Sequence, residues 1–378
     1  MPDYGMNMAS VGNRNRAAIL NYINKKGEAS RKEIAGATGL TAAAVTQISQ
    51  SLIKEGILTE TGSLEGSGAG RKQVGLCIDY DCIYVLSVNI EQTRTVIALS
   101  NMKGETAQVV RLETKANRTP ERLLGKIAEA CRTMLDEATL AVRGKTAAIC
   151  VGIPGIVDSE RGIALHAYGI WEEEVAVCRI LEGLTGLPTR LCNNVNAFAL
   201  ASSLYGIGRN YDNMLVIKWG PGVGGTILVD GKIYDGRHGK AAEIGHYIVR
   251  KNGKTCNCGR RGCLETVVSY AALQEQLSFK EGGLLKAYEK AEAVKQKNVE
   301  EALDLFARSI VNTVTVLAPD RVILSGFMFR EEAVRSLLLV KIGEYDAALA
   351  AHRVLYTELS DCEDYIGPVA YYVNTVLQ

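Results

Sequence analysis

The sequence has almost no net charge and no long apolar run. Its 43 Lys and Arg residues are matched by 42 Asp and Glu residues, a net charge of +1, so any affinity for nucleic acid must come from a local patch. The first apolar runs are broken by Asn, Arg and Lys, so we expect neither a secretory signal nor a membrane span. With 47% apolar and 22% charged residues, the 378-residue chain is expected to form two or three globular domains. A membrane protein, a disordered chain and a small secreted scaffold are excluded.

Ten cysteines occur in this chain without a secretory signal, so we expect reduced thiols and a cytoplasmic protein. Three of them lie within eight residues, from Cys256 to Cys263. The other seven are scattered, several among apolar neighbours, where cysteine acts as a small hydrophobic residue. The scattered cysteines are Cys77, Cys82, Cys131, Cys150, Cys178, Cys192 and Cys362.

Residues 1–76 have the pattern of a winged helix-turn-helix domain. Apolar residues recur at helical spacing over 13–26, and Ser30 with Glu33 predicts a capping box for a short second helix. After a tight turn, Thr41 caps a third helix. Two helices joined by a short turn that contains glycine are typical of the helix-turn-helix motif.

The third helix has one apolar face, on which Val45, Ile48 and Leu52 must pack inward. The opposite face is therefore available to DNA. Small residues at the start of the helix allow its end to approach base edges, and Gln can pair bidentately with adenine. The candidate DNA-binding residues of this helix are Thr41, Ala43, Ala44, Gln47 and Gln50.

A strand, a Gly/Ser-rich tip over 62–70 and a second strand from Val74 predict a wing. Arg71 and Lys72 at its base would reach phosphates or the minor groove. Residues 1–76 carry nine Lys and Arg against six Asp and Glu, a net charge of +3, while the remainder sums to −2. This asymmetry favours DNA binding, and a small helical bundle used for protein contacts is the alternative.

Residues 77–378 show strand hairpins followed by helices, and this pattern occurs twice. It predicts two related α/β lobes, over about 77–193 and 194–378, with a cleft between them. The predicted strands cover 83–88, 95–99, 108–112, 147–152, 214–218, 226–229 and 321–324, and the predicted helices cover 120–139 and 303–317.

Three cysteines and a histidine give the strongest chemical signal. Cys256, Cys258 and Cys263, with His246 ten residues upstream, offer three thiolates and one imidazole, a closed tetrahedral set for structural zinc. Three reduced thiols beside an unrelated histidine are the alternative, because a disulfide between Cys256 and Cys258 is sterically poor. With no open coordination position, the metal would hold the loop 246–263 rather than activate water.

Two carboxylates flank this loop, Glu243 before His246 and Glu265 after Cys263. Ionised carboxylates are strong hydrogen-bond acceptors, so together with the imidazole they could bind several hydroxyls of a polyol. A surface or helix-capping role is the alternative for each carboxylate, but a metal loop would fix them at one place.

The chain resembles the ROK family (repressors, open reading frames and sugar kinases), in particular its transcriptional-repressor branch. Besides the winged helix-turn-helix, the resemblance rests on Gly152–Asp158, Gly220–Gly225, Glu243–His246 and Cys256–Glu265, and it spans essentially the whole chain. It implies a winged helix-turn-helix followed by an actin/hexokinase-like (ribonuclease H-like) α/β domain of two lobes. It also implies a hexose-type ligand in the cleft, a zinc loop whose histidine touches metal and sugar, and homodimers or homotetramers.

The resemblance also implies sugar contacts. Asn193 and Asn194 stand where the family's kinases have Asn-Asp, the Asn binding sugar and the Asp acting as catalytic base. Two further residues come from loops that line the pocket in the family; for His166 the alternative is a loop histidine with satisfied hydrogen bonds. The implied sugar-binding set is Gly155, His166, Asn193, Asn194, Glu243, His246 and Glu265.

Three parts of a kinase site are altered. Asn194 replaces the catalytic Asp, and an amide cannot take a proton at neutral pH. The first phosphate loop, Asp followed by Gly-Gly-Thr in the kinases, reads Asn-Ile-Glu-Gln-Thr over 89–93, and Glu91 would bring a carboxylate toward phosphate. Near the adenosine site, Ser-Gly replaces Gly-Gly beside bulky Phe327. The Gly-rich loop over 220–225 remains, but such a loop alone is weak support. We therefore predict that the chain is not an enzyme.

These features together predict a sugar-responsive transcription factor, and within that class a repressor of carbohydrate-utilisation genes. A dimer would place two recognition helices on a palindromic operator. Sugar binding would change the closure of the lobes and so the spacing of the heads, and by linkage operator DNA would then weaken sugar binding. The alternatives are a sugar kinase with an accessory DNA-binding head, a regulator controlled by a protein partner, and an activator or dual regulator.

Replacing Arg71 with Ala tests the wing. If the wing contacts phosphates, this change should weaken operator binding by about 1 kcal/mol and flatten its salt dependence, because one cation no longer displaces counterions. Operator affinity measured over a series of salt concentrations checks this, and an unchanged affinity and salt slope would remove the wing from the interface.

Overall fold

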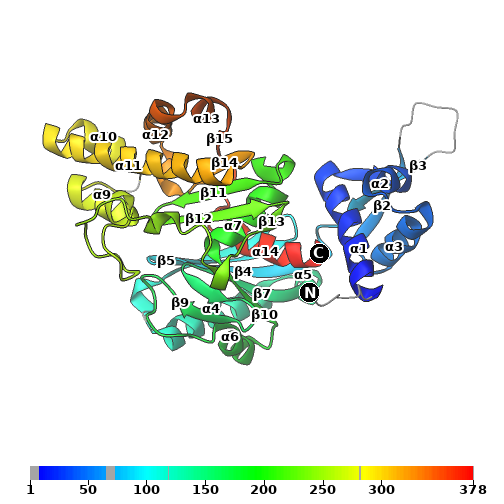
Figure 1. The fold of residues 1–378 in the computed structure, drawn as a ribbon. Helices are drawn as coiled ribbons and strands as arrows, with labels where there is room; N and C mark the ends of the chain where they lie inside the picture. Colours follow the sequence, from blue (N-terminus) through cyan, green and yellow to red (C-terminus); the bar gives the residue numbers. More distant parts are fainter. Residues whose placement is uncertain (1–7, 65–72, 118, 281, 378) are drawn as a thin grey trace.

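A small head and a larger body with two β-sheets make up the molecule (Figure 1). The structure is a computed structural model, and it describes residues 8–64, 73–117, 119–280 and 282–377. Arg71, Lys72 and most of the expected wing tip lie outside the described residues, so the predicted contacts of the wing with DNA stay a prediction.

The head has the three predicted helices. The two predicted wing strands are joined by a third short strand, β1, in one sheet. The capping box is confirmed: the N–H of Glu33 donates to Ser30 Oγ over 3.2 Å, and the N–H of Ser30 donates to the Glu33 carboxylate over 2.8 Å. The first helix begins five residues earlier than predicted, at Met8. The elements of the head are α1 (Met8–Lys26), β1 (Glu28–Ser30), α2 (Arg31–Thr38), α3 (Ala42–Lys54), β2 (Leu58–Leu64) and β3 (Gln73–Ile78).

The first sheet of the body has strand order β10-β7-β4-β5-β6. Its first three strands in the chain pair antiparallel. Strand β7 then pairs parallel with β4, and β10 pairs parallel with β7. A hairpin of β8 (Ile156–Asp158) and β9 (Ile163–His166) projects after β7. The other elements are β4 (Tyr84–Ile90), β5 (Arg94–Asn101), β6 (Thr106–Glu113), α4 (Pro120–Glu137), α5 (Leu140–Lys145), β7 (Thr146–Ile153), α6 (Val177–Thr185) and β10 (Thr189–Asn193).

The second sheet repeats this topology, with strand order β13-β12-β11-β14-β15. Three antiparallel strands are again followed by two parallel additions, which explains the repeated pattern in the sequence. Its elements are β11 (Met214–Trp219), β12 (Val223–Val229), β13 (Lys232–Ile233), α8 (Glu265–Val268), α9 (Tyr270–Leu277), α10 (Leu284–Glu289), α11 (Ala293–Leu317), β14 (Arg321–Ser325), α12 (Glu332–Tyr345), α13 (Ala347–His352) and β15 (Val354–Tyr356).

Two helices, α7 (Asn194–Leu204) and α14 (Ile366–Leu377), lie between the sheets in the middle of the molecule (Figure 1). They pack on each other, and α14 also packs on β4, β7 and α1. The end of the chain thus returns to the first sheet, and we propose that the first lobe includes 366–377 in addition to the expected 77–193.

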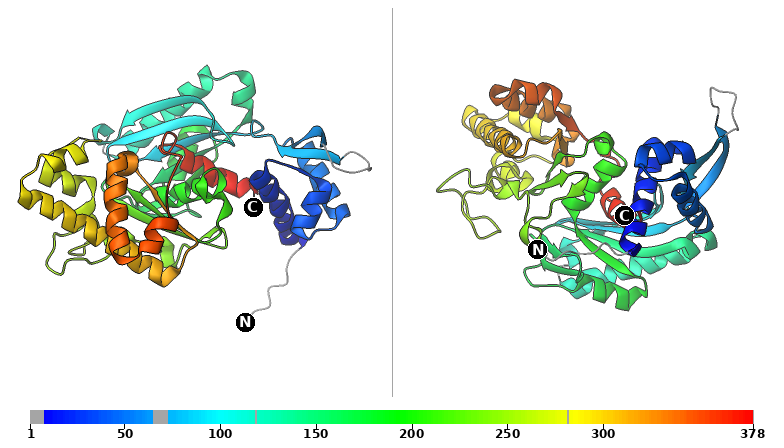
Figure 2. Two further views of the ribbon diagram at one scale, coloured as in Figure 1. Left: turned by 90° about the horizontal axis from the view of Figure 1, so that it is seen from above. Right: turned by 45° about the vertical axis from the view of Figure 1, so that its right-hand side comes forward.

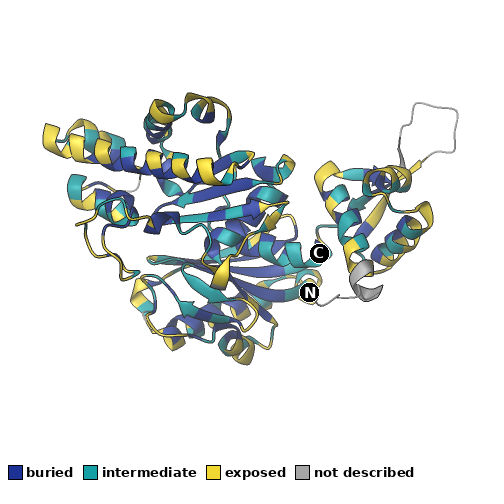
Figure 3. Ribbon diagram, in the orientation of Figure 1, coloured by how far each residue is buried: buried dark blue, intermediate teal, exposed yellow. Residues whose placement is uncertain are grey.

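Most residues of the central strands are buried, and exposed residues lie on the outward faces of the surrounding helices (Figure 3). One continuous apolar cluster joins the head to the body: it includes Leu20 and Ile23 of α1, Leu204 of α7 and Leu377 of α14. Figure 2 shows the head at one end of the body, beside the C-terminal helix. Within the described ranges, we find no helix whose length and apolar character would let it cross a membrane.

Replacing Ser30 with Ala should destabilise α2 by about 1 kcal/mol, because the N–H of Glu33 loses its acceptor. Amide hydrogen exchange over residues 31–38 should then accelerate about five-fold. The matched control is Ser49→Ala in the same head: Ser49 Oγ is buried and has no hydrogen-bond partner among the described residues, so its removal should not accelerate exchange. Equal acceleration in both variants would contradict a specific role for the cap.

Candidate functional site

A pocket between the two sheets collects most of the predicted ligand-binding residues. Six of the seven line it, and so do Glu91, Tyr168, Lys218 and the Gly-rich loop. We call it the cleft pocket. The six are Gly155, Asn193, Asn194, Glu243, His246 and Glu265.

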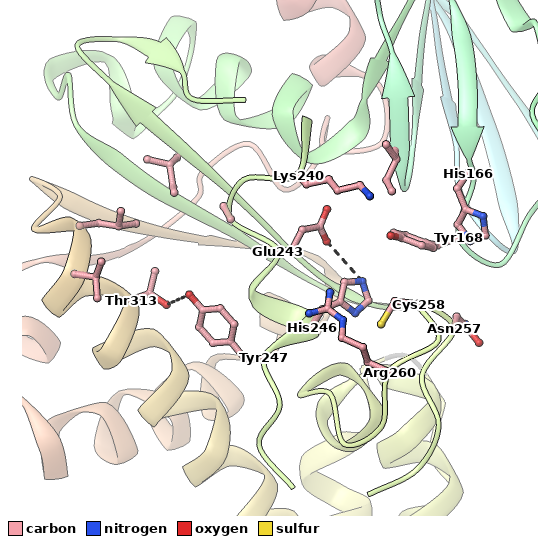
Figure 4. A pocket seen from close by; sticks show the side chains of 15 residues that line it. His166, Tyr168, Lys240, Glu243, His246, Tyr247, Asn257, Cys258, Arg260 and Thr313 are labelled. Carbon is pink, nitrogen blue, oxygen red and sulfur yellow. Dashed lines mark hydrogen bonds and ion pairs between the residues drawn. The ribbon is translucent and has the colours of Figure 1, made fainter. Parts of the chain in front are cut away.

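His166 lies elsewhere. It lines an adjoining outer cavity of about 610 Å³, which shares Tyr168, Glu243 and His246 with the cleft pocket (Figure 4). The Tyr168 ring packs edge-on between the two histidine rings, 4.8 Å from that of His166 and 5.4 Å from that of His246. His166, Glu243 and His246 thus line the outer cavity together, and of these three only Glu243 and His246 also line the cleft pocket.

Asn193 ends β10 and caps α7. Its Oδ1 accepts from the backbone N–H groups of Val195 (2.8 Å) and Asn196 (3.0 Å), and its Nδ2 donates to the carbonyl of Gly155 (2.8 Å). One side chain thus fixes both the start of α7 and the loop that carries Gly155. One N–H of the amide is left for a ligand.

Asn194, Glu91 and Lys218 form a buried polar group on the floor of the cleft. Asn194 Nδ2 and Lys218 Nζ both donate to Glu91 Oε1, over 2.9 and 2.8 Å. Because a carboxylate only accepts hydrogen bonds, the amide nitrogen of Asn194 must face Glu91. Asn194 Oδ1 is left buried without a partner among the described residues.

Lys218 is a functional residue that the sequence analysis missed. Its side chain and that of Glu91 are each only 16% exposed. Burial acts to lower the pKa of Lys218, but the neighbouring carboxylates of Glu91 and Glu363 outweigh it, and the pKa lies above its ordinary value. A lysine inside the apolar strand that runs from Met214 to Trp219 was the signal that could have found it.

A recess beside the Gly-rich loop lies on the side of the cleft where the resemblance would place a nucleotide. The Phe327 ring lies against the Gly-rich loop so closely that a Cβ on Gly220 would stand 3.0 Å from it. An ion pair between Arg94 and Asp364 (2.9 Å) lines this recess, together with Glu91 and Lys218. Carboxylates and an aromatic ring thus line the recess.

The four predicted metal ligands come together. The ligand atoms of His246, Cys256, Cys258 and Cys263 all lie within 4.8 Å of one another, which suits tetrahedral zinc, whose S···S edges are about 3.8 Å. Cys258 Sγ lies 3.6 Å from Cys263 Sγ, and Cys256 Sγ lies 3.5 Å from His246 Nδ1. His246 therefore turns Nδ1 toward the thiols and Nε2 toward Glu243 Oε2, 3.6 Å away.

The pKa values of the four ligands shift in different directions. Burial lowers the pKa of His246, which favours the neutral imidazole that metals bind. Burial raises the pKa of Cys256 to about 12 and also raises that of Cys263. Burial acts to raise the pKa of Cys258 too, but hydrogen bonds from the Arg260 backbone and the neighbouring thiols outweigh it and lower the pKa. The group can hold a metal cation.

Glycine is required where this loop turns back on itself. Gly262 has φ +76°, and a Cβ there would stand 1.6 Å from the Arg250 carbonyl oxygen. The tight turn returns Cys263 to the other ligands and places Glu265 at the start of α8, facing the cleft.

Glu243 and Glu265 present acceptors to the cleft pocket. Burial raises the pKa of both, and their mutual repulsion raises that of Glu265 further. Glu265 Oε2 accepts from the N–H of Val223 over 3.0 Å, and Arg260 beside Glu243 partly offsets the effect of burial on the Glu243 pKa. Two carboxylates and an imidazole on one wall suit a neutral ligand with several hydroxyl donors.

In the head, the structure places the helical DNA-binding candidates on one side of α3. Ala43, Gln47 and Gln50 are exposed, while Val45 and Leu52 are buried, as predicted. Thr41 caps the helix, accepting from the N–H of Ala44 over 3.2 Å, so its hydroxyl is engaged in the fold.

The chain matches known proteins along most of its length. The ROK family matches residues 85–360, and a winged helix-turn-helix DNA-binding family matches residues 13–59. Among relatives, the xylose repressor of Caldicellulosiruptor bescii is 29% identical over 68% of this chain and 64% of its own length. The dual transcriptional regulator NagC of Escherichia coli is 24% identical over 85% of this chain and 82% of its own. The glucokinase of Thermotoga maritima is 28% identical over 65% of this chain and 82% of its own length.

The fold has a solved counterpart along almost the whole chain. The crystal structure of a ROK family transcriptional regulator, described as a homologue of the Escherichia coli MLC protein, superposes with a TM-score of 0.79 at 22% identity and covers 97% of this chain and 98% of that one. The chain therefore belongs to the ROK family and carries a winged helix-turn-helix DNA-binding domain at its N-terminus.

Proposed function

We propose that this protein is a sugar-responsive DNA-binding regulator, a repressor of carbohydrate-utilisation genes whose operator affinity changes when a sugar binds in the cleft pocket. One observation carries the proposal: the chain that bears an exposed helix-turn-helix face also bears a cleft with Glu243, His246 and Glu265 on one wall. The xylose repressor and the dual regulator NagC among its relatives support it.

The sugar would hydrogen-bond to Glu243, Glu265, His246 Nε2 and the free N–H of Asn193. The two carboxylates would accept from sugar hydroxyls, and His246 Nε2, which carries the proton when Nδ1 binds the metal, would donate to a hydroxyl oxygen; two acidic side chains on one wall favour an uncharged sugar over a sugar acid. Gly155 and Asn194 would line the same space, and His166 would meet a substituent that extends into the outer cavity.

The metal would be structural zinc, held by His246, Cys256, Cys258 and Cys263. Three thiolates with one imidazole leave no open position, so zinc would hold the loop and, through Nδ1, the orientation of the His246 ring. Its role would be to fix Glu243 and Glu265 relative to each other.

We propose that the chain does not transfer phosphate, although a glucokinase is among its relatives. Asn194 offers no base, and Glu91 is held by Lys218 where negatively charged phosphates would have to enter. Arg94 and Asp364 pair with each other in the same recess.

On DNA, two heads of a homodimer would insert α3 into successive major grooves of a palindromic site, about one helical turn apart. The exposed side chains of Ala43, Gln47 and Gln50 would face the bases, while Thr41 and Ala44 would fix the start of the helix.

A thermal-shift screen tests the sugar proposal directly. Zinc-loaded protein is heated with D-xylose, D-glucose, N-acetyl-D-glucosamine and their phosphates, with and without ATP. One free sugar should raise the melting temperature and ATP should add nothing, because a ligand of the native state stabilises by about 2.7 kcal/mol at 100 times its Kd. An effect of ATP with turnover would support the kinase alternative; no effect of any sugar would favour control by a protein partner.

Replacing Glu243 with Gln should weaken binding of the responding sugar at least about ten-fold, because hydrogen bonds to a charged group contribute about 1.5–3 kcal/mol. Calorimetric titration gives the dissociation constants. The control is Glu173→Gln, an exposed residue outside the cleft pocket, which should bind like the wild type. An unchanged affinity in the Glu243 variant would remove this carboxylate from the sugar site.

Replacing Cys258 with Ser should release the metal, lower the melting temperature and weaken sugar binding, because the loop that carries Glu243 and Glu265 loses its anchor. Metal content is measured by elemental analysis of the purified protein. Cys362→Ser, which alters a half-buried thiol outside the cluster, should keep the metal. Full metal content in the Cys258 variant would end the zinc assignment.

A further inference from the structure

Helix α7 runs from the cleft pocket to the DNA-binding head. It begins with Asn194 on the floor of the pocket and has 11 residues, which gives a rod of about 16 Å. All of its residues are buried except Asn196 and Ser203, which are half-buried. A helix enclosed in this way moves as a unit, because close-packed neighbours resist bending of its middle.

Both lobes hold the start of α7. Asn193 ties it to the Gly155 loop of the first lobe, and Asn194 reaches Lys218 in the second lobe through the shared Glu91 carboxylate. A ligand that changes the separation of the lobes must therefore move the start of α7 relative to at least one of them.

The far end of α7 meets a buried side chain of the head, Asn24 in the last turn of α1. Asn24 Nδ2 donates to the carbonyl of Leu204 over 3.4 Å, and Asn24 Oδ1 accepts from the Tyr80 hydroxyl over 2.8 Å. Just beyond α7, Arg209 Nη2 donates to the Asn24 carbonyl over 2.6 Å. Asn24 is only 4% exposed.

The orientation of the Asn24 amide is fixed by chemistry, since the Leu204 carbonyl can only accept. The apolar contacts around it, such as those of Leu20 and Ile23, are non-directional and would tolerate sliding of the head on the body. The hydrogen bonds of Asn24 are directional and desolvated, so breaking their geometry leaves buried groups unpaired. Asn24 therefore sets the angle at which the head sits on α7.

We propose that Asn24 is the positioning residue that couples the cleft pocket to the DNA-binding head through α7. A shift at Asn194 is delivered by the rigid helix to Leu204 and Arg209, and Asn24 turns that shift into a new position of α1 and hence of α3. The proposal rests on the proposed function, because it needs a sugar that changes operator affinity.

The experiment measures coupling rather than binding alone. The DNA probe is a duplex that wild-type protein selects from a random-sequence pool, and the sugar is whichever of D-xylose, D-glucose and N-acetyl-D-glucosamine raises its melting temperature most. The operator dissociation constant is measured with and without saturating sugar, and their ratio is the coupling.

Asn24→Ala should reduce this ratio about five-fold or more, with sugar affinity in the absence of DNA unchanged, since the cleft pocket is untouched. Tyr80→Phe removes only the hydroxyl that donates to Asn24 and should reduce the ratio in the same direction. If the Asn24→Ala variant does not fold, Tyr80→Phe still tests the coupling.

The matched control is Lys25→Ala, at the next residue of the same junction. The Lys25–Asp212 pair joins head and body over 3.5 Å, but its side chains are 53% and 65% exposed, so its loss should leave the ratio unchanged.

Each outcome bears on one statement. A wild-type ratio in both the Asn24 and Tyr80 variants would overturn the role of Asn24 and leave the proposed function standing. An equal loss in the Lys25 control would do the same. A ratio of one in the wild type, or no sugar that binds, would overturn the proposed function and this inference with it.

Discussion

The burial of Lys218 is the constraint on which the cleft depends. An ammonium group inside an apolar strand must be paired, and Glu91 from the other sheet supplies the charge. That carboxylate then takes the amide of Asn194, which fixes the start of α7. One ion pair thus joins the two sheets and holds the start of the central helix.

The loop of the candidate metal ligands and α7 both line the pocket. The loop presents Glu243, His246 and Glu265, and its shape depends on the turn at Gly262 and on the cluster of metal ligands. Helix α7 presents Asn194 and is capped by Asn193, whose amide also holds the Gly155 loop. The wall that would read sugar hydroxyls and the helix that reaches the head therefore meet at one ligand, which is the arrangement that a sensor needs.

Local pattern predicted much of the secondary structure and the cluster of four candidate metal ligands. The capping box at Ser30 and Glu33, the Thr41 cap and the alternating strands are determined by neighbouring residues, and His246 with the three cysteines lies within 18 residues of sequence. The expected boundary between the lobes did not anticipate that α14 packs on the first sheet. His166 illustrates a similar limit: it lines the outer cavity beside the cleft pocket, and the sequence carries no signal that divides the two spaces.

By itself, the sequence determined the fold class, the family and which residues are candidate metal ligands, because each of these depends on residue types at short spacing. Only the tertiary structure decided that Glu91 meets Lys218 across 127 residues, that Arg94 meets Asp364 across 270, and that Asn24 meets Leu204 across 180. These contacts depend on how the two sheets and the head close around α7. No local period encodes such closure, since the partners share neither an element nor a motif.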